Sequence, residues 1–174
     1  DVYKRQALGY SQESGIPYGI GFIKNKYIGR TFIQGSQKQR ENSVRIKLNV
    51  VSSTVKGKRV VLVDDSIVRG TTCDRIVAAM RRAGAKEVHL RISSPPFQHT
   101  CYFGTDIGSE ENLIANQLSI PEIEKKTGAD TLGYISVAGL LEACRGSRLG
   151  LCTGCFTGKY ATQVGAASKD ALEG

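Results

Sequence analysis

Two adjacent carboxylates and a hydroxyl-rich loop stand out in the segment 60–72. Asp64 and Asp65 follow an apolar run, and the residues after them are Ser66, Ile67, Val68, Arg69, Gly70, Thr71 and Thr72. Hydroxyls and backbone N–H groups at the start of a helix bind phosphate. Because carboxylates repel phosphate, we expect the aspartates to hold sugar hydroxyls or a hard cation such as Mg²⁺. The segment therefore predicts a site for a phosphorylated ribose; in the alternative, the two aspartates only cap a turn.

The elements around this segment predict an α/β fold. Residues 60–63 are β-branched or leucine without polar alternation, which is typical of a parallel strand buried on both faces. Residues 72–83 carry apolar side chains at helical spacing and precede Gly84, a C-terminal cap, and residues 87–92 form the next strand. Since strands alternate with helices, we expect a mostly parallel sheet flanked by helices, with the carboxylates at a strand's carboxyl end.

The remaining elements are expected at less regular intervals. In the first 50 residues the pattern predicts the last part of a helix at 7–14, a strand at 18–23 and an exposed helix at 37–48. Further along it predicts short helices at 110–115 and 121–127, a strand at 132–135, a helix at 137–144 capped by Ser136, and an extended tail at 157–174.

Positive charge is concentrated in one stretch of the chain. The 174 residues carry a formal net charge of +8. Ten Lys and Arg but one acid lie between Lys24 and Arg59, which leaves fourteen bases and fifteen acids elsewhere. Such a stretch attracts nucleic acid or a phosphate-rich ligand, although a plain solvated face fits equally well. The sequence has no run of about eighteen apolar residues, so we expect no membrane span.

The cysteines form a second set of candidate ligands. Five cysteines and no visible leader favour a reducing compartment, in which thiols bind metals or are simply buried. Cys152 and Cys155 have the spacing of iron–sulfur, zinc and redox sites, and Cys101 precedes them by 51 positions. His99, beside Cys101, is a candidate fourth zinc ligand. The alternative is three ordinary thiols; Cys73 and Cys144 are expected to be buried small hydrophobes.

The segment 60–72 resembles the 5-phosphoribosyl diphosphate (PRPP) motif of type I phosphoribosyltransferases. Five further segments are similar to the glutamine phosphoribosyl diphosphate amidotransferase family: 14–18 (SGIPY), 24–33 (KNKYIGRTFI), 93–96 (SSPP), 128–132 (GADTL) and 152–158 (CTGCFTG). The resemblance runs from about Ala7 to Thr162. It implies a type I phosphoribosyltransferase-like sheet, with residues 7–156 as an incomplete, N-terminally truncated domain and residues 157–174 as a tail. Residues 1–6 do not match and are interpreted as foreign.

The resemblance also implies a reaction. In this family ammonia from glutamine displaces pyrophosphate from PRPP, giving 5-phosphoribosylamine at the entry to purine synthesis. Asp64 and Asp65 would hold the ribose hydroxyls and Mg²⁺, residues 66–72 the 5-phosphate, and no residue would be a covalent nucleophile. Candidates on a loop that closes over PRPP are Lys24, Tyr27 and Arg30. Purine nucleotides as feedback inhibitors, a homo-oligomer (a tetramer in full-length members) and a cytoplasmic location are also expected.

One branch of the family binds a [4Fe–4S] cluster through four cysteines, and Cys101, Cys152 and Cys155 match three of them, with zinc as the alternative metal. Because the glutaminase domain and an upstream serine ligand of the family have no counterpart here, we expect the 174 residues alone to be inactive. Two other functions remain open: a non-catalytic PRPP- or nucleotide-binding module, and a basic nucleic-acid-binding domain. Only Tyr27 and Phe32 are aromatic within the basic stretch, which disfavours nucleic acid.

Overall fold

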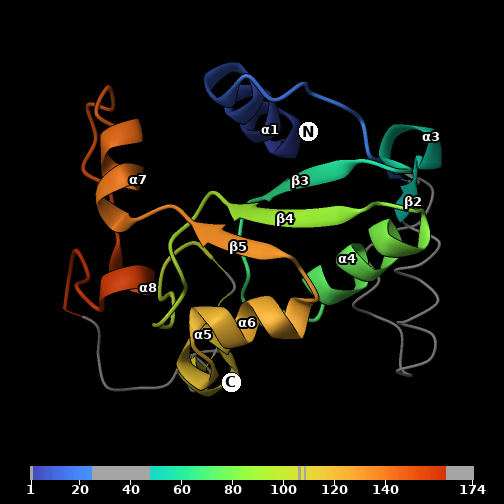
Figure 1. Ribbon diagram of the computed structural model, residues 1–174. Coiled ribbons are helices and arrows are strands. Elements are labelled where there is room, and N and C mark those ends of the chain that lie inside the picture. The colour runs from blue at the N-terminus through green and yellow to red at the C-terminus, as the bar shows by residue number, and fades with distance from the viewer. Residues whose placement is uncertain (1, 25–47, 106, 108, 164–174) are drawn as a thin grey trace.

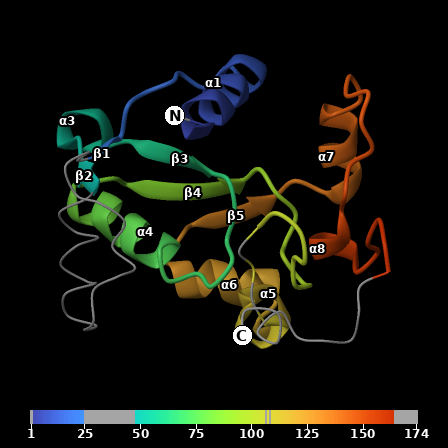
Figure 2. The same ribbon diagram turned by 180° about the vertical axis from the view of Figure 1, so that it is seen from behind.

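A three-stranded parallel sheet forms the centre of the protein (Figure 1). The computed structural model describes residues 2–24, 48–105, 107 and 109–163. The strands β3 (Arg59–Asp64), β4 (Glu87–Ile92) and β5 (Thr131–Tyr134) lie in that order. Helices α4 (Cys73–Arg82) and α6 (Ile120–Thr127) cover one face, and α1 (Val2–Ser14) lies on the other (Figure 2). This arrangement confirms the predicted α/β class, a mostly parallel sheet flanked by helices.

The core lies between the sheet and the α4–α6 face. Val88, Leu90 and Ile92 of β4 are at most 3% exposed and pack against buried side chains of α4 and α6 such as Met80 and Ile123. The alternate residues of β4 are only half-buried on the other face. Residues 60–63 of β3 are half-buried too, so the prediction that they are buried on both faces was wrong. In the described residues β3 pairs with β4 along one edge only, which leaves it partly accessible.

Local sequence signals explain where several elements begin and end. Ser119 and Glu122 form a capping box at the start of α6, and Gly128 ends that helix with a φ of 73°. Ser136 accepts a hydrogen bond from the Gly139 amide at 3.0 Å, which caps α7 (Val137–Ala143). The expected bounds of β4 are confirmed at both ends, and those of α4, α7 and β5 within one residue. No helix in the described part of the chain is long and apolar enough to cross a membrane.

Other elements differ from the prediction. The strands β1 (Phe22–Lys24) and β2 (Leu48–Val50) form an antiparallel pair, so β1 covers only the end of the expected strand 18–23. Of the expected helix 37–48, residues 37–47 lie outside the described residues and Leu48 is in β2. One expected helix is two short ones, η2 (Glu110–Asn112) and α5 (Ile114–Gln117); α3 (Ser52–Val55) and α8 (Gly154–Thr157) were not expected. α1 starts at Val2, so it spans the expected boundary at residue 7, which stays a prediction.

A single carboxylate joins α4, β4 and the segment before β5. Asp130 accepts hydrogen bonds at 2.6 Å from both the Val88 amide and the Arg81 guanidinium. Arg81 also donates to the carbonyls of Lys86, at 2.9 Å, and Gly128, at 3.3 Å. The Val88 N–H and then the Arg81 charge lower the pKa of Asp130. The side chains of the ion pair are about a third exposed, so the pair contributes to stability mainly through the hydrogen bonds that it makes with the backbone.

We expect Asp130→Ala to lower the melting temperature by about 5 °C, because charge-assisted hydrogen bonds are lost. Since the pKa of Asp130 is lowered on folding, its contribution is present above the ordinary value of 3.8 and is lost as the pH falls through the lowered folded value. The gap between the two proteins should therefore shrink in strong acid. Glu142→Ala, which removes an exposed ion pair with Arg145, is the control and should change little. Equal melting temperatures for both variants would contradict the assignment.

Candidate functional site at the carboxyl edge of the sheet

The residue order along the three strands brings the candidate groups to one edge. Asp64 is opposite Ile92, and Ile92 is opposite Tyr134, so these three side chains point to the face covered by α4. The amide and the hydroxyl of Ser93 both donate to the Asp64 carbonyl at 3.0 Å. The loops that follow β3 and β4 are thus joined where they leave the sheet. In open α/β sheets this edge is where ligands bind.

Asp64 has the most perturbed carboxylate of the site. Burial raises its pKa from 3.8 to about 6. The Asp65 amide, which donates to Oδ1 at 2.9 Å, lowers the pKa, and the Asp65 charge raises it further. At neutral pH the group is still mostly ionised. The neighbouring Asp65 carboxylate accepts the Ser66 hydroxyl at 3.0 Å. Two anionic groups, one of them partly desolvated, suit sugar hydroxyls or a hard cation.

The loop after the aspartates has an apolar and a polar side. Ile67 is 2% exposed in the core, and the Val68 carbonyl accepts the Ile114 amide at 2.9 Å. Thr71 and Thr72 are exposed, and Thr72, which precedes α4, makes no side-chain capping bond. The apolar residues therefore anchor the loop through packing. The threonine hydroxyls and the first N–H groups of α4 are the part that suits a phosphate.

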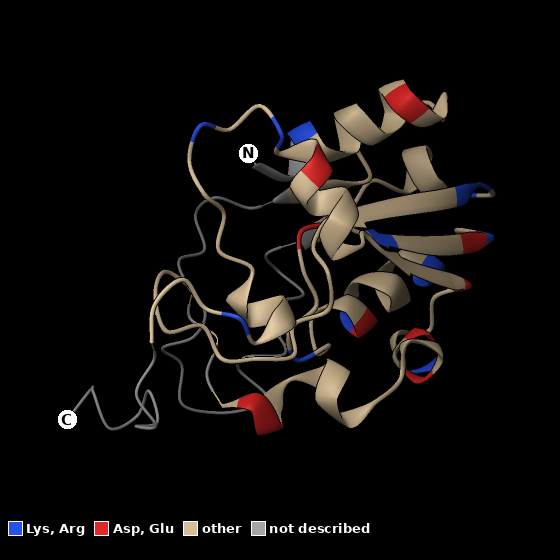
Figure 3. Ribbon diagram, turned by 90° about the vertical axis from the view of Figure 1, so that its left-hand side faces the viewer, with Lys and Arg blue, Asp and Glu red and all other residues tan. Residues whose placement is uncertain are grey.

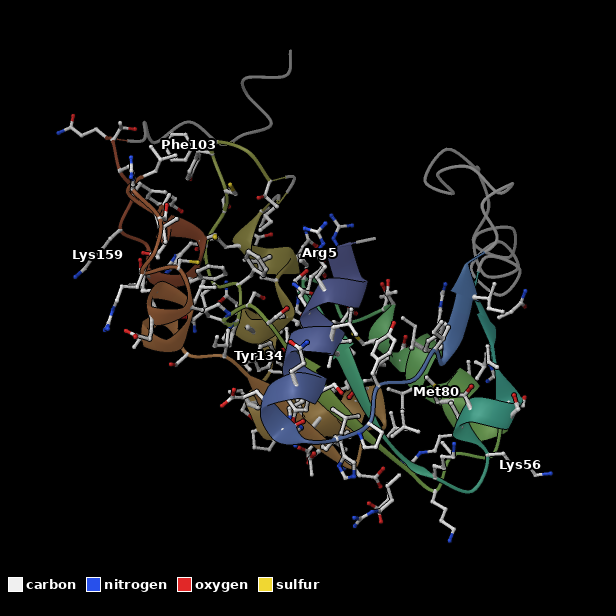
Figure 4. The ribbon with its side chains drawn as sticks, turned by 90° about the horizontal axis from the view of Figure 1, so that it is seen from above. Arg5, Lys56, Met80, Phe103, Tyr134 and Lys159 are labelled. Atoms are coloured by element: carbon white, nitrogen blue, oxygen red, sulfur yellow. The ribbon has the colours of Figure 1, made fainter. Side chains whose placement is uncertain are left out.

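Cys73 contributes to this site in a way that the sequence did not indicate. Its thiol is 3% exposed, as expected for a buried small residue, but its sulfur lies 4.0 Å from Oδ2 of Asp64. Burial and then the Asp64 charge raise the pKa of Cys73 to about 12, so the thiol is protonated. Burial raises the pKa of Tyr134 to about 12 as well, and its buried hydroxyl has no partner among the described residues. Figure 4 shows Tyr134 between the core near Met80 and the end near Phe103.

Two of the three cysteines proposed as metal ligands lie at a second small core beside this edge. Cys101 and Cys155 pack on a cluster of Phe97, Ile107 and Leu113. The Cys155 carbonyl accepts the amides of residues 98 and 99, each at 3.0 Å, which joins two distant segments. Burial, and then the charges of the Cys101 and Cys152 thiols, raise the pKa of Cys155. The fold thus brings Cys101 and Cys155 onto one cluster, while Cys152 is exposed.

The sulfur of Cys101 lies among backbone N–H groups. Its sulfur accepts the Thr105 amide at 3.4 Å. Burial alone would raise its pKa, but the backbone N–H groups of residues 103, 104 and 105 outweigh burial and lower it. Yet no group of three or more His, Cys, Asp or Glu side chains in the described ranges is arranged to hold a metal ion. His99 is bonded through Nδ1 to Glu110 at 3.0 Å.

The expected closing loop cannot be compared with the structure. Tyr27 and Arg30 lie outside the described residues, and Lys24 is described only as the last backbone position of β1. Over the rest of the chain basic and acidic residues are interspersed (Figure 3). Six of the ten bases of the positive stretch fall in residues 25–47, outside the described residues, whereas Lys56, Lys58 and Arg59 are exposed at and just before the start of β3.

Comparisons with known proteins agree with this geometry. Residues 9–93 match the phosphoribosyl transferase domain family. The matched region ends at Ser93, the residue bonded to the Asp64 carbonyl. The chain has the phosphoribosyltransferase fold.

Among curated proteins, it is 55% identical to the amidophosphoribosyltransferase of Bacillus subtilis (strain 168) over 162 residues, 91% of this chain and 34% of the relative. It is 57% identical to the amidophosphoribosyltransferase of Archaeoglobus fulgidus over 160 residues, 91% of this chain and 35% of the relative. The chain thus matches the phosphoribosyltransferase part of these enzymes and spans about a third of their length.

A solved structure shares the fold along almost the whole chain. It is the glutamine phosphoribosylpyrophosphate amidotransferase of B. subtilis complexed with ADP and GMP. The TM-score is 0.82 at 51% sequence identity, covering 97% of this chain and 38% of the solved one. A likeness at this level confirms the fold expected from the sequence.

We expect Gly70→Ala to destabilise the phosphoribosyltransferase fold more than the matched change Gly57→Ala. Both glycines have positive φ, 79° and 73°, so each alanine pays the same backbone strain. At Gly70, however, a Cβ would lie 2.5 Å from Cδ1 of Ile114, a core side chain 1% exposed, whereas nothing lies within 4 Å at Gly57. The difference should be about 1 kcal/mol or more in the free energy of unfolding, measured by denaturant titration. Equal losses would mean that Ile114 moves aside freely.

Proposed function

We propose that this chain is the phosphoribosyltransferase part of an amidophosphoribosyltransferase. The complete enzyme would transfer the 5-phosphoribosyl group of PRPP to ammonia derived from glutamine, releasing pyrophosphate and forming 5-phosphoribosylamine for purine synthesis. The observation that carries the proposal is the edge-of-sheet constellation, in which paired carboxylates lead into a hydroxyl-rich loop at the start of α4. The proposal is supported by the similarity of this chain to an amidophosphoribosyltransferase, to which it is 55% identical over 91% of its own length.

The residues of the edge divide the work of binding and charge stabilisation. Thr71, Thr72 and the first amides of α4 hold the 5-phosphate. Asp64 and Asp65 bind the ribose hydroxyls. Their negative charges stabilise the positive charge that develops at the anomeric carbon as pyrophosphate departs. Because Asp64 is partly desolvated, its field on that carbon is weakly screened by water. None of these groups forms a covalent bond with substrate; they position it.

Magnesium fits the donors of this edge. In the described part of the chain the Cys73 thiol donates to Oδ2 of Asp64, and carboxylate oxygens are ligands that Mg²⁺ prefers. Asp64 and Asp65 would hold the ion, which would neutralise charge on the diphosphate when bound. Closure by Lys24, Tyr27 and Arg30 remains part of the proposal. The proposal also includes ammonia supply from a glutaminase domain, feedback by purine nucleotides, assembly as a homo-oligomer and a cytoplasmic location. The feedback is consistent with a relative's structure that contains ADP and GMP.

PRPP titration tests the proposed site in the 174-residue chain itself. We expect PRPP to bind in the presence of Mg²⁺, and Asp64→Asn or Asp65→Asn to weaken binding about tenfold or more, because a charge-assisted contact is lost. Glu142→Gln on the exposed face of α7 is the control and should bind as the unaltered chain does. Turnover with free ammonia should be absent or very slow. Normal PRPP affinity in both Asn variants would leave the aspartates as turn caps.

The two other functions give different results in the same titrations. A nucleic-acid-binding domain would bind single-stranded DNA with an affinity that falls steeply between two salt concentrations, without binding PRPP. A non-catalytic module would bind PRPP normally but form no phosphoribosylamine in the full-length protein. Strong ammonia-dependent product formation by residues 1–174 alone would contradict the expected incompleteness of the domain.

We further propose that Cys101, Cys152 and Cys155 are three ligands of a [4Fe–4S] cluster, with the fourth outside this chain. The amides that donate to the Cys101 sulfur favour its thiolate form, and the fold joins its loop to α8. Zinc is the second candidate, because Glu110 holds Nδ1 of His99 and so orients Nε2 as a ligand. Neither metal has a complete ligand set within the described residues.

We expect the full-length protein, purified without oxygen, to be brown and to contain about four irons per chain. Cys152→Ser and Cys155→Ser should give colourless protein of lower thermal stability, because metal binding and folding are coupled. Cys144→Ser, at the end of α7, is the matched control and should stay brown. The 174-residue chain should hold iron weakly or not at all. One zinc per chain in colourless anaerobic protein would favour the His99 site, and no metal would leave three ordinary thiols.

A further inference from the structure

The side chain behind Asp64 is Cys73, the first residue of α4. The two oxygens of the Asp64 carboxylate have different neighbours: Oδ1 accepts the Asp65 amide at 2.9 Å, and Oδ2 lies 4.0 Å from the Cys73 sulfur. Cys73 is 3% exposed, so little of it is in contact with solvent. A carboxylate contacted at both oxygens from different directions has a fixed plane.

The neighbours of Asp64 within the sheet cannot supply this contact. Ile92, opposite Asp64 on β4, is apolar and 3% exposed. Tyr134, opposite Ile92, carries the next hydroxyl on the same face, but that hydroxyl has no hydrogen-bond partner in the described part of the chain. Oδ2 therefore depends on the helix beneath the sheet for its contact. The start of α4 thus serves both the phosphate loop and the carboxylate.

A thiol is well suited to this position. A sulfur donor makes a long and weak hydrogen bond, so it orients the carboxylate without taking much charge from it. A residue without any donor would leave a half-buried carboxylate oxygen without a partner.

We propose that Cys73 is a positioning residue, whose S–H···O contact fixes the Asp64 carboxylate in the orientation that binds Mg²⁺–PRPP. The inference rests on the proposed function and deepens it. Cys73 acts on the ligand only through Asp64, whereas the phosphate is held by the loop and the amides of α4. Its loss should therefore weaken the Mg²⁺-dependent part of binding and spare the affinity for phosphate alone.

The experiment compares four variants of the 174-residue chain by calorimetric titration. Cys73→Ala removes the donor with a smaller side chain, Cys73→Val removes it with a larger, β-branched one, and Cys73→Ser restores a donor. Tyr134→Phe is the matched control, since it removes an unpartnered hydroxyl from the same face. We expect the Val and Ala variants to bind PRPP with Mg²⁺ about three- to tenfold more weakly. Affinity for inorganic phosphate should be unchanged, and the Ser and Phe variants should match the unaltered chain.

Each other result overturns the inference in a recognisable way. Unchanged PRPP affinity in the Val and Ala variants would show that Asp64 needs no donor, while the proposed function would stand. Parallel loss of PRPP and phosphate affinity, not repaired by Ser, would mean that Cys73 only packs the start of α4. No PRPP binding by the unaltered, folded chain would overturn the proposed function and this inference together.

Discussion

Parallel pairing of β3 with β4 is the constraint on which the site depends. It places Asp64 opposite Ile92, so the carboxylate points to the same face as a core residue that is 3% exposed. A shift of β3 by one residue would turn Asp64 away from α4 and would remove Val60 and Leu62 from their packing with Val88, Leu90 and Ile92. Burial of those three side chains therefore holds the register, and the register puts Asp64 beside Cys73. The chemistry of the edge is set by packing several residues away from it.

The same constraint separates two residues that look equivalent in the sequence. Asp64 is the last residue of β3 and follows its alternation onto the α4 face, where burial raises its pKa to about 6. Asp65 begins the loop and bonds the Ser66 hydroxyl. One carboxylate thus has a partly desolvated environment, and the other begins the proposed phosphate loop. Two adjacent carboxylates with different surroundings can serve a cation and a sugar without both facing the same ligand atom.

Local patterns were sufficient where a structure is made by neighbouring residues. β4 and α4 followed from apolar spacing, and the contiguous segment 64–72 could be interpreted from its own chemistry. The antiparallel pairing of Phe22 with Val50, the contact of Cys73 with Asp64 and the joining of Cys155 to the loop after β4 depend on distant or loop-separated residues, and no local period indicates them. The half-buried state of β3 was mispredicted for a related reason: apolar composition does not show what covers a strand.

The loop 66–72 lies between the two cores, which connects the cysteines to the proposed sugar site. Ile67 belongs to the main core, while Val68 packs on the small cluster that also carries Cys101 and Cys155. Ile114 reinforces the junction, since its amide donates to the Val68 carbonyl and its side chain faces Gly70. A change in the packing around the thiols therefore reaches the loop through Val68. This coupling needs no cysteine that would itself contact the ribose or the phosphate. A metal held by these thiols would act on the substrate site in that way, by fixing the wall against which the loop is packed.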